Sequence, residues 1–186
     1  MIGYAITASF CTHKASLESL RKLRLEGYDI QPIMSENAYS TDTRFGMASD
    51  LVMQVEELCD RKIIHTVKDA EPLGPKTPLD ALVIAPCTGN TLAKIANGIT
   101  DTAVTMAAKA HLRRDKTLII ALASNDAMSQ NLGNVAKLIT RKSVFFVRMR
   151  QDDPKGKPHS LVAEMSEVPE ALRCALLGEQ MRPLFL

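Results

Sequence analysis

Leu82-Val83-Ile84-Ala85-Pro86-Cys87-Thr88-Gly89-Asn90-Thr91 is the stretch that decides the fold. Its first four residues are apolar without alternation, which is typical of a strand buried on both faces of a parallel sheet. We expect Pro86 to end that strand, because proline has no N–H to donate to a neighbouring strand. Apolar residues then recur at helical spacing, and we expect Asn90 or Thr91 to cap the new helix. A buried strand that leads directly into a helix indicates an α/β fold.

The turn between this strand and this helix is suited to binding an anion. The first backbone N–H groups of a helix lack partners within the helix and carry the positive end of its dipole. Gly89 allows a ligand to approach the backbone, and Thr88, Asn90 and Thr91 add side-chain donors. These features predict a site for a phosphate or for a ring with imide oxygens. An ordinary capped turn explains the same residues, so the turn alone leaves both interpretations open.

Strand-like and helix-like segments alternate along the whole chain. Strands are expected at 2–7, 28–34, 81–85, 117–123 and 144–149, and helices at 14–26, 47–59, 91–113 (two helices), 131–139 and from 166 onward. This alternation predicts one domain over residues 1–186. Its fold is expected to be α/β, a three-layer, doubly wound parallel sheet of the Rossmann-like or flavodoxin-like type.

Single residues mark the expected ends and faces of the helices. Gly27 and Gly98 follow helical segments and are expected to stop them. Asp101 is expected to cap the next helix. In the last helix we expect Leu172, Leu176 and Leu177 to face the core.

Composition limits the classes of partner. The 186 residues carry a formal net charge of only +2, with 4% aromatic residues and no tryptophan, so neither nucleic acid nor an anionic membrane is indicated. The chain shows no signal peptide and no membrane-length apolar run, so we expect it in the cytoplasm. Four cysteines without a Cys-x-x-Cys pair predict reduced thiols. No two histidines have the spacing of metal ligands, so no metal site is expected.

Polar residues follow several of the expected strands. Thr7 and Ser9 come after the first strand, Ser35 after the second, and Asn125 after a later one. Ligands of open α/β sheets bind beyond the carboxyl ends of the strands, so these side chains are expected on one rim. Each serine alone is more often a helix cap, but their common placement on one rim makes Ser9 and Ser35 candidates for binding a phosphate. The first turn lacks the Gly-x-Gly-x-x-Gly fingerprint, which disfavours a classical dinucleotide site.

The histidines and one long loop are further candidates for chemistry. His13, His65 and His159 fall in expected loops, where each can titrate near neutral pH. A dipole interaction at the end of a helix explains His111. The Pro- and Gly-containing segment 151–159 is either a mobile flap over a site or a solvated surface turn.

Taken together, these residues resemble the flavoprotein family that includes the cysteine decarboxylases of lantibiotic and coenzyme A biosynthesis and the flavin prenyltransferases. The matching pieces are 6–9, 33–38, 85–91 and 123–128, and the third is similar to the family's Pro-Ala-Ser-Ala-Asn-Thr motif. Within that family, the blocks 69–76, 85–91, 104–113 and 151–158 look like the B subunits of dipicolinate synthases. The resemblance covers nearly the whole chain.

The resemblance implies FMN as the cofactor. It implies that the phosphate meets Ser9 and Ser35, that Thr88, Gly89, Asn90 and Thr91 line the rest of the flavin site, and that Thr7, Ala8 and Phe10 supply backbone or packing. Asn125 matches a substrate-contacting asparagine of the decarboxylases, and His65 is the second catalytic candidate. His65 stands further before Pro86 than the decarboxylases' catalytic histidine, and Ala123 replaces an arginine of the prenyltransferases. Neither of those two activities is therefore carried over to this chain.

The leading interpretation is an FMN-binding subunit of a dipicolinate synthase, an oxidoreductase of spore formation. The resemblance implies a partner, the separate NAD(P)-type A subunit of dipicolinate synthase, and a dihydrodipicolinate-level precursor as substrate. Asn125, Lys155 and Lys157 are candidates for contacting this dicarboxylate, on grounds of charge.

Two alternatives remain at this point. One is a flavin-dependent decarboxylase of a small carboxylated thiol, and the other is a scaffolding subunit with a vestigial flavin pocket. The resemblance also implies a homo-oligomer, with the small and apolar residues of 92–106 as a candidate contact. A core helix explains those residues equally well.

Overall fold

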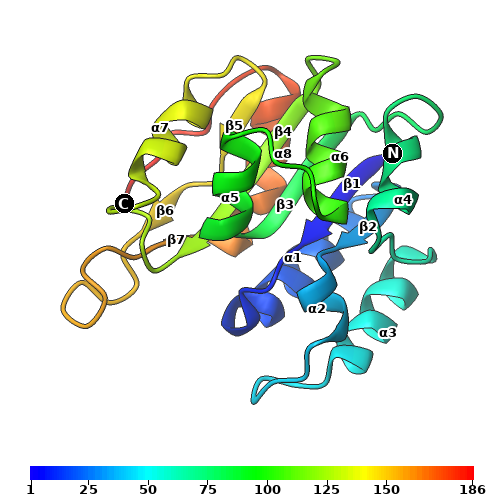
Figure 1. Ribbon diagram of the computed structural model, residues 1–186, viewed down its shortest axis with the longest axis horizontal. Helices are drawn as coiled ribbons and strands as arrows, with labels where there is room; N and C mark the ends of the chain where they lie inside the picture. Colours follow the sequence, from blue (N-terminus) through cyan, green and yellow to red (C-terminus); the bar gives the residue numbers. More distant parts are fainter.

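The computed structural model describes all 186 residues and has a single seven-stranded sheet at its centre (Figure 1). The strands are β1 (Ile2–Ile6), β2 (Ile30–Met34), β3 (Ala81–Thr88), β4 (Thr117–Ser124), β5 (Val144–Phe146), β6 (Met149–Arg150) and β7 (Leu161–Ala163). Parallel strands lie in the order β2-β1-β3-β4, with β5 parallel beside β4. β7 pairs antiparallel with both β6 and the carboxyl end of β4. This mostly parallel sheet confirms the predicted doubly wound α/β fold.

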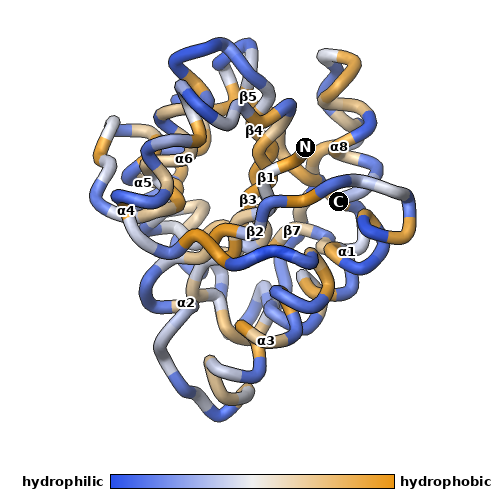
Figure 2. The backbone as a smooth tube through the Cα atoms, turned by 90° about the vertical axis from the view of Figure 1, so that its right-hand side faces the viewer, coloured by the Kyte–Doolittle hydropathy of each residue, from blue (hydrophilic) through white to orange (hydrophobic).

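Helices cover both faces of the sheet and complete the three expected layers. They are α1 (His13–Leu25), α2 (Glu36–Ser40), α3 (Ala48–Cys59), α4 (Val67–Ala70), α5 (Gly89–Ala96), α6 (Ala103–Leu112), α7 (Leu132–Ile139) and α8 (Val168–Leu176), with 3-10 turns at Phe10–Thr12, Glu71–Leu73 and Met165–Glu167. α1, α3 and α8 pack on one face, where Leu20 and Leu172 are buried. α5, α6 and α7 pack on the other, where Leu92 and Leu138 are buried. Figure 2 shows the apolar strands running between these layers. None of the helices combines the length and apolar character needed to span a membrane.

Pro86 does not end its strand, contrary to the expectation. β3 continues to Thr88, and its register against β4 shifts at the proline. A bulge there accommodates the missing N–H, so pairing with β4 resumes beyond it. The N-cap of α5 is therefore Thr88 rather than Asn90 or Thr91, because the Thr88 hydroxyl accepts a hydrogen bond from the Thr91 N–H at 3.3 Å.

Other helix ends agree in part with the expectations. Gly27 and Gly98 follow α1 and α5 with φ of +88° and +73°, the left-handed conformation that favours glycine, and both predicted stops are confirmed. Thr102 rather than Asp101 caps α6. The Asp101 carboxylate is instead paired with the Lys94 ammonium at 2.8 Å.

The last helix begins two residues later than expected, at Val168. Its buried positions are Val168, Pro169, Ala171, Leu172 and Ala175, so Leu172 faces the core as expected. Leu176 and Leu177 lie beyond that stripe and are 45% and 78% exposed. The expectation that these two leucines face the core is therefore wrong.

Candidate functional site

The strand order places the candidate site at a topological switch point. β1 lies between β2 and β3, so the chain leaves β1 toward one edge of the sheet and returns to build the other. Doubly wound sheets bind ligands in the crevice beyond the carboxyl ends of such strands. Ser35, Thr7, Thr88 and Asn125 follow or end β2, β1, β3 and β4 respectively. The structure thus brings four sequence-predicted residues to the carboxyl ends of four neighbouring strands.

Thr7 joins the ends of β1 and β3. Its Oγ1 accepts a hydrogen bond from the Thr88 N–H at 2.9 Å and donates one to the Pro86 carbonyl oxygen at 2.8 Å. The Thr7 N–H donates to the same carbonyl at 3.2 Å. Because the single O–H of this buried hydroxyl is used within the protein, Thr7 positions Thr88 and has no side-chain donor left for an anion.

The neighbouring hydroxyls keep donor capacity. Ser35 Oγ accepts from the Ala38 N–H at 3.3 Å and retains its O–H. Thr88 Oγ1 donates to Thr91 Oγ1 at 3.1 Å, which leaves the Thr91 O–H free to donate. Ser9 is held only through its backbone, for example by the Thr12 hydroxyl on its carbonyl oxygen at 2.7 Å. Three hydroxyl donors are therefore available on the rim for an anion.

Gly89 is required for packing between two loops. A Cβ at Gly89 would collide with Ser124 Oγ, with Asn131 Nδ2 at 2.7 Å and with Asp126 Oδ1 at 2.9 Å. The sequence predicted that this glycine lets a ligand approach the backbone. The structure gives a different reason for a glycine here, which is the close packing around it. Its small size lets the start of α5 lie directly against the loop after β4.

The loop after β4 is fixed by a carboxylate that the sequence analysis did not single out. Asp126 Oδ1 accepts from the Ser124 hydroxyl at 2.5 Å and from Asn131 Nδ2 at 2.9 Å. The Ser124 hydrogen bond, followed by that of Asn131, lowers the pKa of Asp126. Asn125 lies between Ser124 and Asp126, which are held by these hydrogen bonds, and is itself exposed. Its amide is thus presented to solvent at the rim from a rigid loop.

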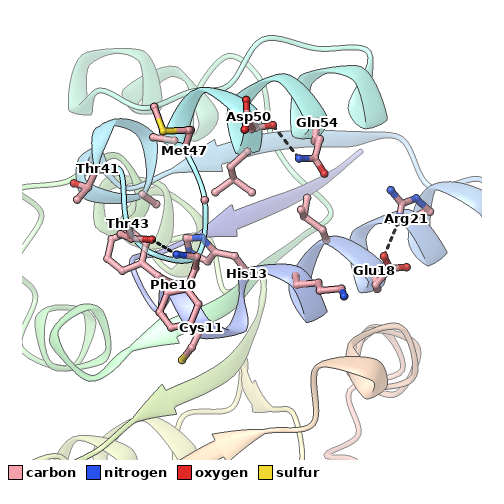
Figure 3. Close-up of a pocket in the computed structure, with 17 residues that line it drawn as sticks. Phe10, Cys11, His13, Glu18, Arg21, Thr41, Thr43, Met47, Asp50 and Gln54 are labelled. Atoms are coloured by element: carbon pink, nitrogen blue, oxygen red, sulfur yellow. Dashed lines mark hydrogen bonds and ion pairs between the residues drawn. The ribbon is translucent and has the colours of Figure 1, made fainter.

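A cavity of about 560 Å³ adjoins this rim, between α1 and the segment 41–48. Figure 3 shows Phe10, Cys11, His13 and Thr43 gathered at one end, with Asp50 and Gln54 on the α3 wall. Of the sequence-predicted cofactor residues, Phe10 alone lines the cavity. No local motif marks the other residues, because the cavity forms only when α1 and α3 pack together.

His13 begins α1 rather than lying in a loop, and it links this cavity to the rim. Its Nε2 lies 2.8 Å from the Thr7 carbonyl oxygen, which can only accept, so Nε2 carries the proton. Burial lowers the pKa of His13, against the opposing effect of the Thr7 hydrogen bond. The ring also meets Phe10 edge to face, with centroids 5.4 Å apart. A neutral His13 therefore keeps an unpaired Nδ1 beside the cavity.

The other histidines lie apart from one another. His65 stacks on Tyr39 of α2, with ring centroids 3.8 Å apart and planes at 12°, outside the β2 edge of the sheet. His111 is buried, and its Nε2 bonds the Thr117 carbonyl oxygen at 2.7 Å, so its role is more than the expected dipole interaction. His159 is exposed in the segment between β6 and β7.

The segment 151–159 connects β6 and β7 and is mostly exposed. Lys157 pairs with Asp152 at 3.0 Å, and Lys155 makes no ion pair. The His159 carbonyl oxygen accepts from the Met128 N–H at 2.9 Å, so the base of this segment is attached to the loop that carries Asn125. The lysines themselves lie on the exposed part of the connection.

The small and apolar residues of 92–106 are explained by the core. Leu92, Ile95, Ala103 and Val104 are buried against the sheet in α5 and α6. The alternative of a core helix is thus the one that the structure supports for this region.

Comparisons with known proteins agree with this architecture. A family model described as Flavoprotein matches residues 1–173. The B subunit of dipicolinate synthase from Bacillus subtilis (strain 168) is 40% identical over 185 residues, covering 100% of this chain and 92% of that protein. The crystal structure of the dipicolinate synthase B subunit from Bacillus halodurans superposes with a TM-score of 0.91 at 38% identity, covering 100% of this chain and 95% of that one. The FMN-dependent cysteine decarboxylase SpaF has a TM-score of 0.70 at 22% identity, covering 95% and 94%, which shows a shared fold.

Proposed function

The chain belongs to the Flavoprotein family, and on that premise we propose that it binds FMN at the carboxyl ends of β1 and β3 as the B subunit of a dipicolinate synthase. The observation that carries the proposal is the 40% identity to the Bacillus subtilis protein over 185 residues. The resemblance inferred from the sequence blocks is confirmed by this match. The switch-point geometry supports the place of the site, because Thr7 and Thr88 join β1 and β3 there.

The residues on the rim fit a phosphate-bearing cofactor. Ser9 and Ser35 would hold the phosphate through their free hydroxyls, with Ala8 and Phe10 packing beside it. Thr88, Gly89, Asn90 and Thr91 would line the rest of the site at the N-terminus of α5, where the first N–H groups lack helical partners. FMN, when bound, supplies a hydride or electron acceptor. The protein holds and orients the flavin and the substrate.

A second set of residues is proposed to contact the substrate. Asn125 presents its amide at the rim, and Lys155 and Lys157 supply positive charge from the attached connection. His65 is a further candidate for proton transfer, although its stacking on Tyr39 places it outside the β2 edge. We assign the substrate to the level of a dihydrodipicolinate, oxidised to dipicolinate.

We propose that the partner is the NAD(P)-type A subunit of dipicolinate synthase. We also propose that the protein acts in the cytoplasm of a spore-forming cell. A homo-oligomer is proposed as the assembled state, to be checked by the solution mass of the purified chain. The scaffolding alternative predicts that the partner dehydrogenase works with a flavin-free form of this chain. The decarboxylase alternative has support from the fold shared with SpaF.

Reconstitution tests this function directly. The chain is mixed with the partner dehydrogenase and a freshly generated dihydrodipicolinate-level precursor, and dipicolinate is measured by its ultraviolet absorption. We expect formation to require both proteins and to rise with added FMN. Formation that is independent of this chain would contradict the proposal, and formation that needs the chain but never FMN would favour scaffolding. Release of carbon dioxide from a cysteine-type substrate would favour the decarboxylase.

A further inference from the structure

A recess between α5, α6 and the end of α7 is lined by positive charge alone. Its volume is about 210 Å³, and its charged lining residues are Lys109, Arg113 and Arg141. No aspartate or glutamate lines this basic recess, and none of the three cations takes part in an ion pair. All three residues are exposed. Uncompensated cations around one hollow favour an acidic ligand.

The cations reach the recess from separate parts of the chain. Lys109 lies in the last turn of α6, Arg113 follows that helix, and Arg141 comes after α7. A cation at the end of each helix stabilises the dipole of that helix, but the packing of α5 against both α6 and α7 is what brings them to one hollow. Arg113 Nη2 lies against Gly74, where an added Cβ would meet it at 2.8 Å. Lys109 and Arg141 are therefore the cations left free to face a ligand.

One carboxylate nearby opposes an acidic ligand. The Asp115 N–H donates to the carbonyl oxygen of Leu112, a lining residue, at 3.0 Å, so Asp115 lies next to the recess. Asp115 makes no ion pair and is exposed. Asp101, before the start of α6, is already neutralised by Lys94 at 2.8 Å. The balance of charge at the recess remains positive.

The base of the recess is apolar. Ile95, Ala108 and Leu112 line it and are buried. Ile99, in the connection between α5 and α6, also lines it and is 48% exposed. An apolar base inside a cationic rim is complementary to an aliphatic side chain that stands between carboxylates.

Size and screening favour a protein segment over a free anion. Small-molecule sites usually measure roughly 300 to 1,000 Å³, so a hollow of about 210 Å³ suits one side chain better than a whole ligand. Exposed ion pairs contribute little because water and salt screen them, so a free phosphate would be held weakly. A protein segment adds apolar contact within the hollow and several carboxylates on its rim. No aromatic side chain lines the recess, so it offers no stacking surface to a nucleic acid.

We propose that the basic recess docks an acidic segment of a partner protein, with one aliphatic side chain in the hollow and flanking carboxylates facing Lys109 and Arg141. Arg113 and Arg141 come shortly before β4 and β5, at the amino ends of these strands. The recess thus lies at the opposite end of the sheet from the proposed FMN site. The inference does not rest on the proposed function, and a partner docked here leaves the rim open.

Fluorescence anisotropy of a labelled peptide, Glu-Asp-Leu-Glu-Asp, tests the inference on the full chain. We expect saturable binding that weakens as salt is added. Arg141→Glu and Lys109→Glu should each weaken it about tenfold, because each replaces an attraction by a repulsion. Lys142→Glu is the matched control, since Lys142 is the exposed neighbour of Arg141 and does not line the recess. It should bind within about twofold of the unmodified chain at about 150 mM salt, where distant charges are screened.

Further variants separate the contributions of charge and of the apolar side chain. The peptides Glu-Asp-Ser-Glu-Asp, which lacks the aliphatic side chain, and Gln-Asn-Leu-Gln-Asn, which lacks the charges, should both bind more weakly. Asp115→Asn should tighten binding of the acidic peptide, because it removes the opposing charge. Ile99→Ser should weaken it, because Ile99 supplies exposed apolar surface at the recess.

Several results would overturn the inference. Absence of saturable peptide binding, or equal effects of Arg141→Glu and Lys142→Glu, would show that the recess is not a docking site. Inorganic phosphate that binds more tightly than the peptide would make it a site for a free anion. Self-association of the chain that Arg141→Glu abolishes would make the occupant a second copy.

The FMN titration keeps this inference distinct from the proposed function. Arg141→Glu should take up FMN as the unmodified chain does, and a loss of uptake would overturn a docking role separate from the cofactor. Peptide binding by a chain that takes up no FMN would support the inference and contradict the proposed cofactor. Unchanged unfolding midpoints confirm that these exposed substitutions leave the fold intact.

Discussion

The hydroxyl of Thr7 accepts a hydrogen bond from the backbone N–H of Thr88 at 2.9 Å, across 81 residues of sequence. This contact joins the carboxyl ends of β1 and β3 beyond their last paired residues, Ala5 and Ile84. It also fixes the residue that caps α5. The position of the proposed anion site therefore depends on a side chain that does not itself contact the anion.

Thr7→Val tests this dependence. Valine keeps the shape of threonine but leaves the buried Thr88 N–H without a partner, so we expect a loss of about 1 to 3 kcal/mol in the free energy of unfolding. FMN affinity should fall as well, because Thr88 loses its anchor. Urea unfolding and FMN titration measure the two effects. Thr7→Ser keeps the hydroxyl and should retain most of the unfolding free energy and most of the FMN affinity. A fully stable Thr7→Val protein would show that the contact is dispensable.

Gly89→Ala should separate two loops that now touch. The added methyl would meet Ser124, Asp126 and Asn131, so we expect destabilisation of about 1 to 3 kcal/mol by urea unfolding. Gly133→Ala is the control, since its methyl meets nothing within 4 Å on the exposed side of α7. Helix propensity predicts that Gly133→Ala stabilises by about 0.5 to 1 kcal/mol. Equal effects of the two substitutions would contradict the packing role of Gly89.

Stability should depend on pH through His111. Burial lowers the pKa of His111 in the folded state, so the folded protein binds fewer protons than the unfolded chain below about pH 6.5. The contribution of the neutral imidazole is fully present above that pH and is lost as the pH falls through the folded pKa. His111→Gln should therefore reduce the fall in unfolding free energy between pH 7.5 and pH 5.5. His13, which is shifted in the same direction, should account for part of the remaining slope.

The four thiols should react at very different rates. Burial raises the pKa of Cys87 and raises that of Cys59 to about 11, whereas Cys11 is exposed at the mouth of the cavity. Because the thiolate is the reactive form, iodoacetamide at pH 8 should modify Cys11 first and leave Cys59 and Cys87 unmodified in the folded protein. Mass spectrometry of the digested protein identifies the sites. Early labelling of Cys87 would contradict the closed packing of β3.

The fold and the rim could be predicted because both follow from local patterns. Continuous apolar runs and the polar residues that follow them identify parallel strands and their carboxyl ends, which placed Ser35 and Asn125 correctly. The cap of α5 could not be predicted, since the bulge at Pro86 depends on pairing with β4. The role of Gly89 depends likewise on a loop more than 30 residues away.

The cavity was also beyond the reach of the sequence. It forms between α1 and α3, and its lining includes residues such as Thr43 and Phe45 that carry no motif. His13 was expected in a loop, but the 3-10 turn before it allows the helix to begin there and directs its ring to the Thr7 carbonyl. Contacts between distant segments decide each of these features.

An equilibrium titration with FMN, followed by the visible flavin spectrum, tests the central claim most directly. The account predicts saturable binding of one FMN per chain, weakened about tenfold or more in Ser9→Ala and in Ser35→Ala because each removes a donor to a charged phosphate. Ser166→Ala, an exposed serine far from the rim in sequence, should bind as the unmodified chain does. No saturable binding, or equal affinity in all four proteins, would contradict the FMN site proposed at the carboxyl ends of the strands.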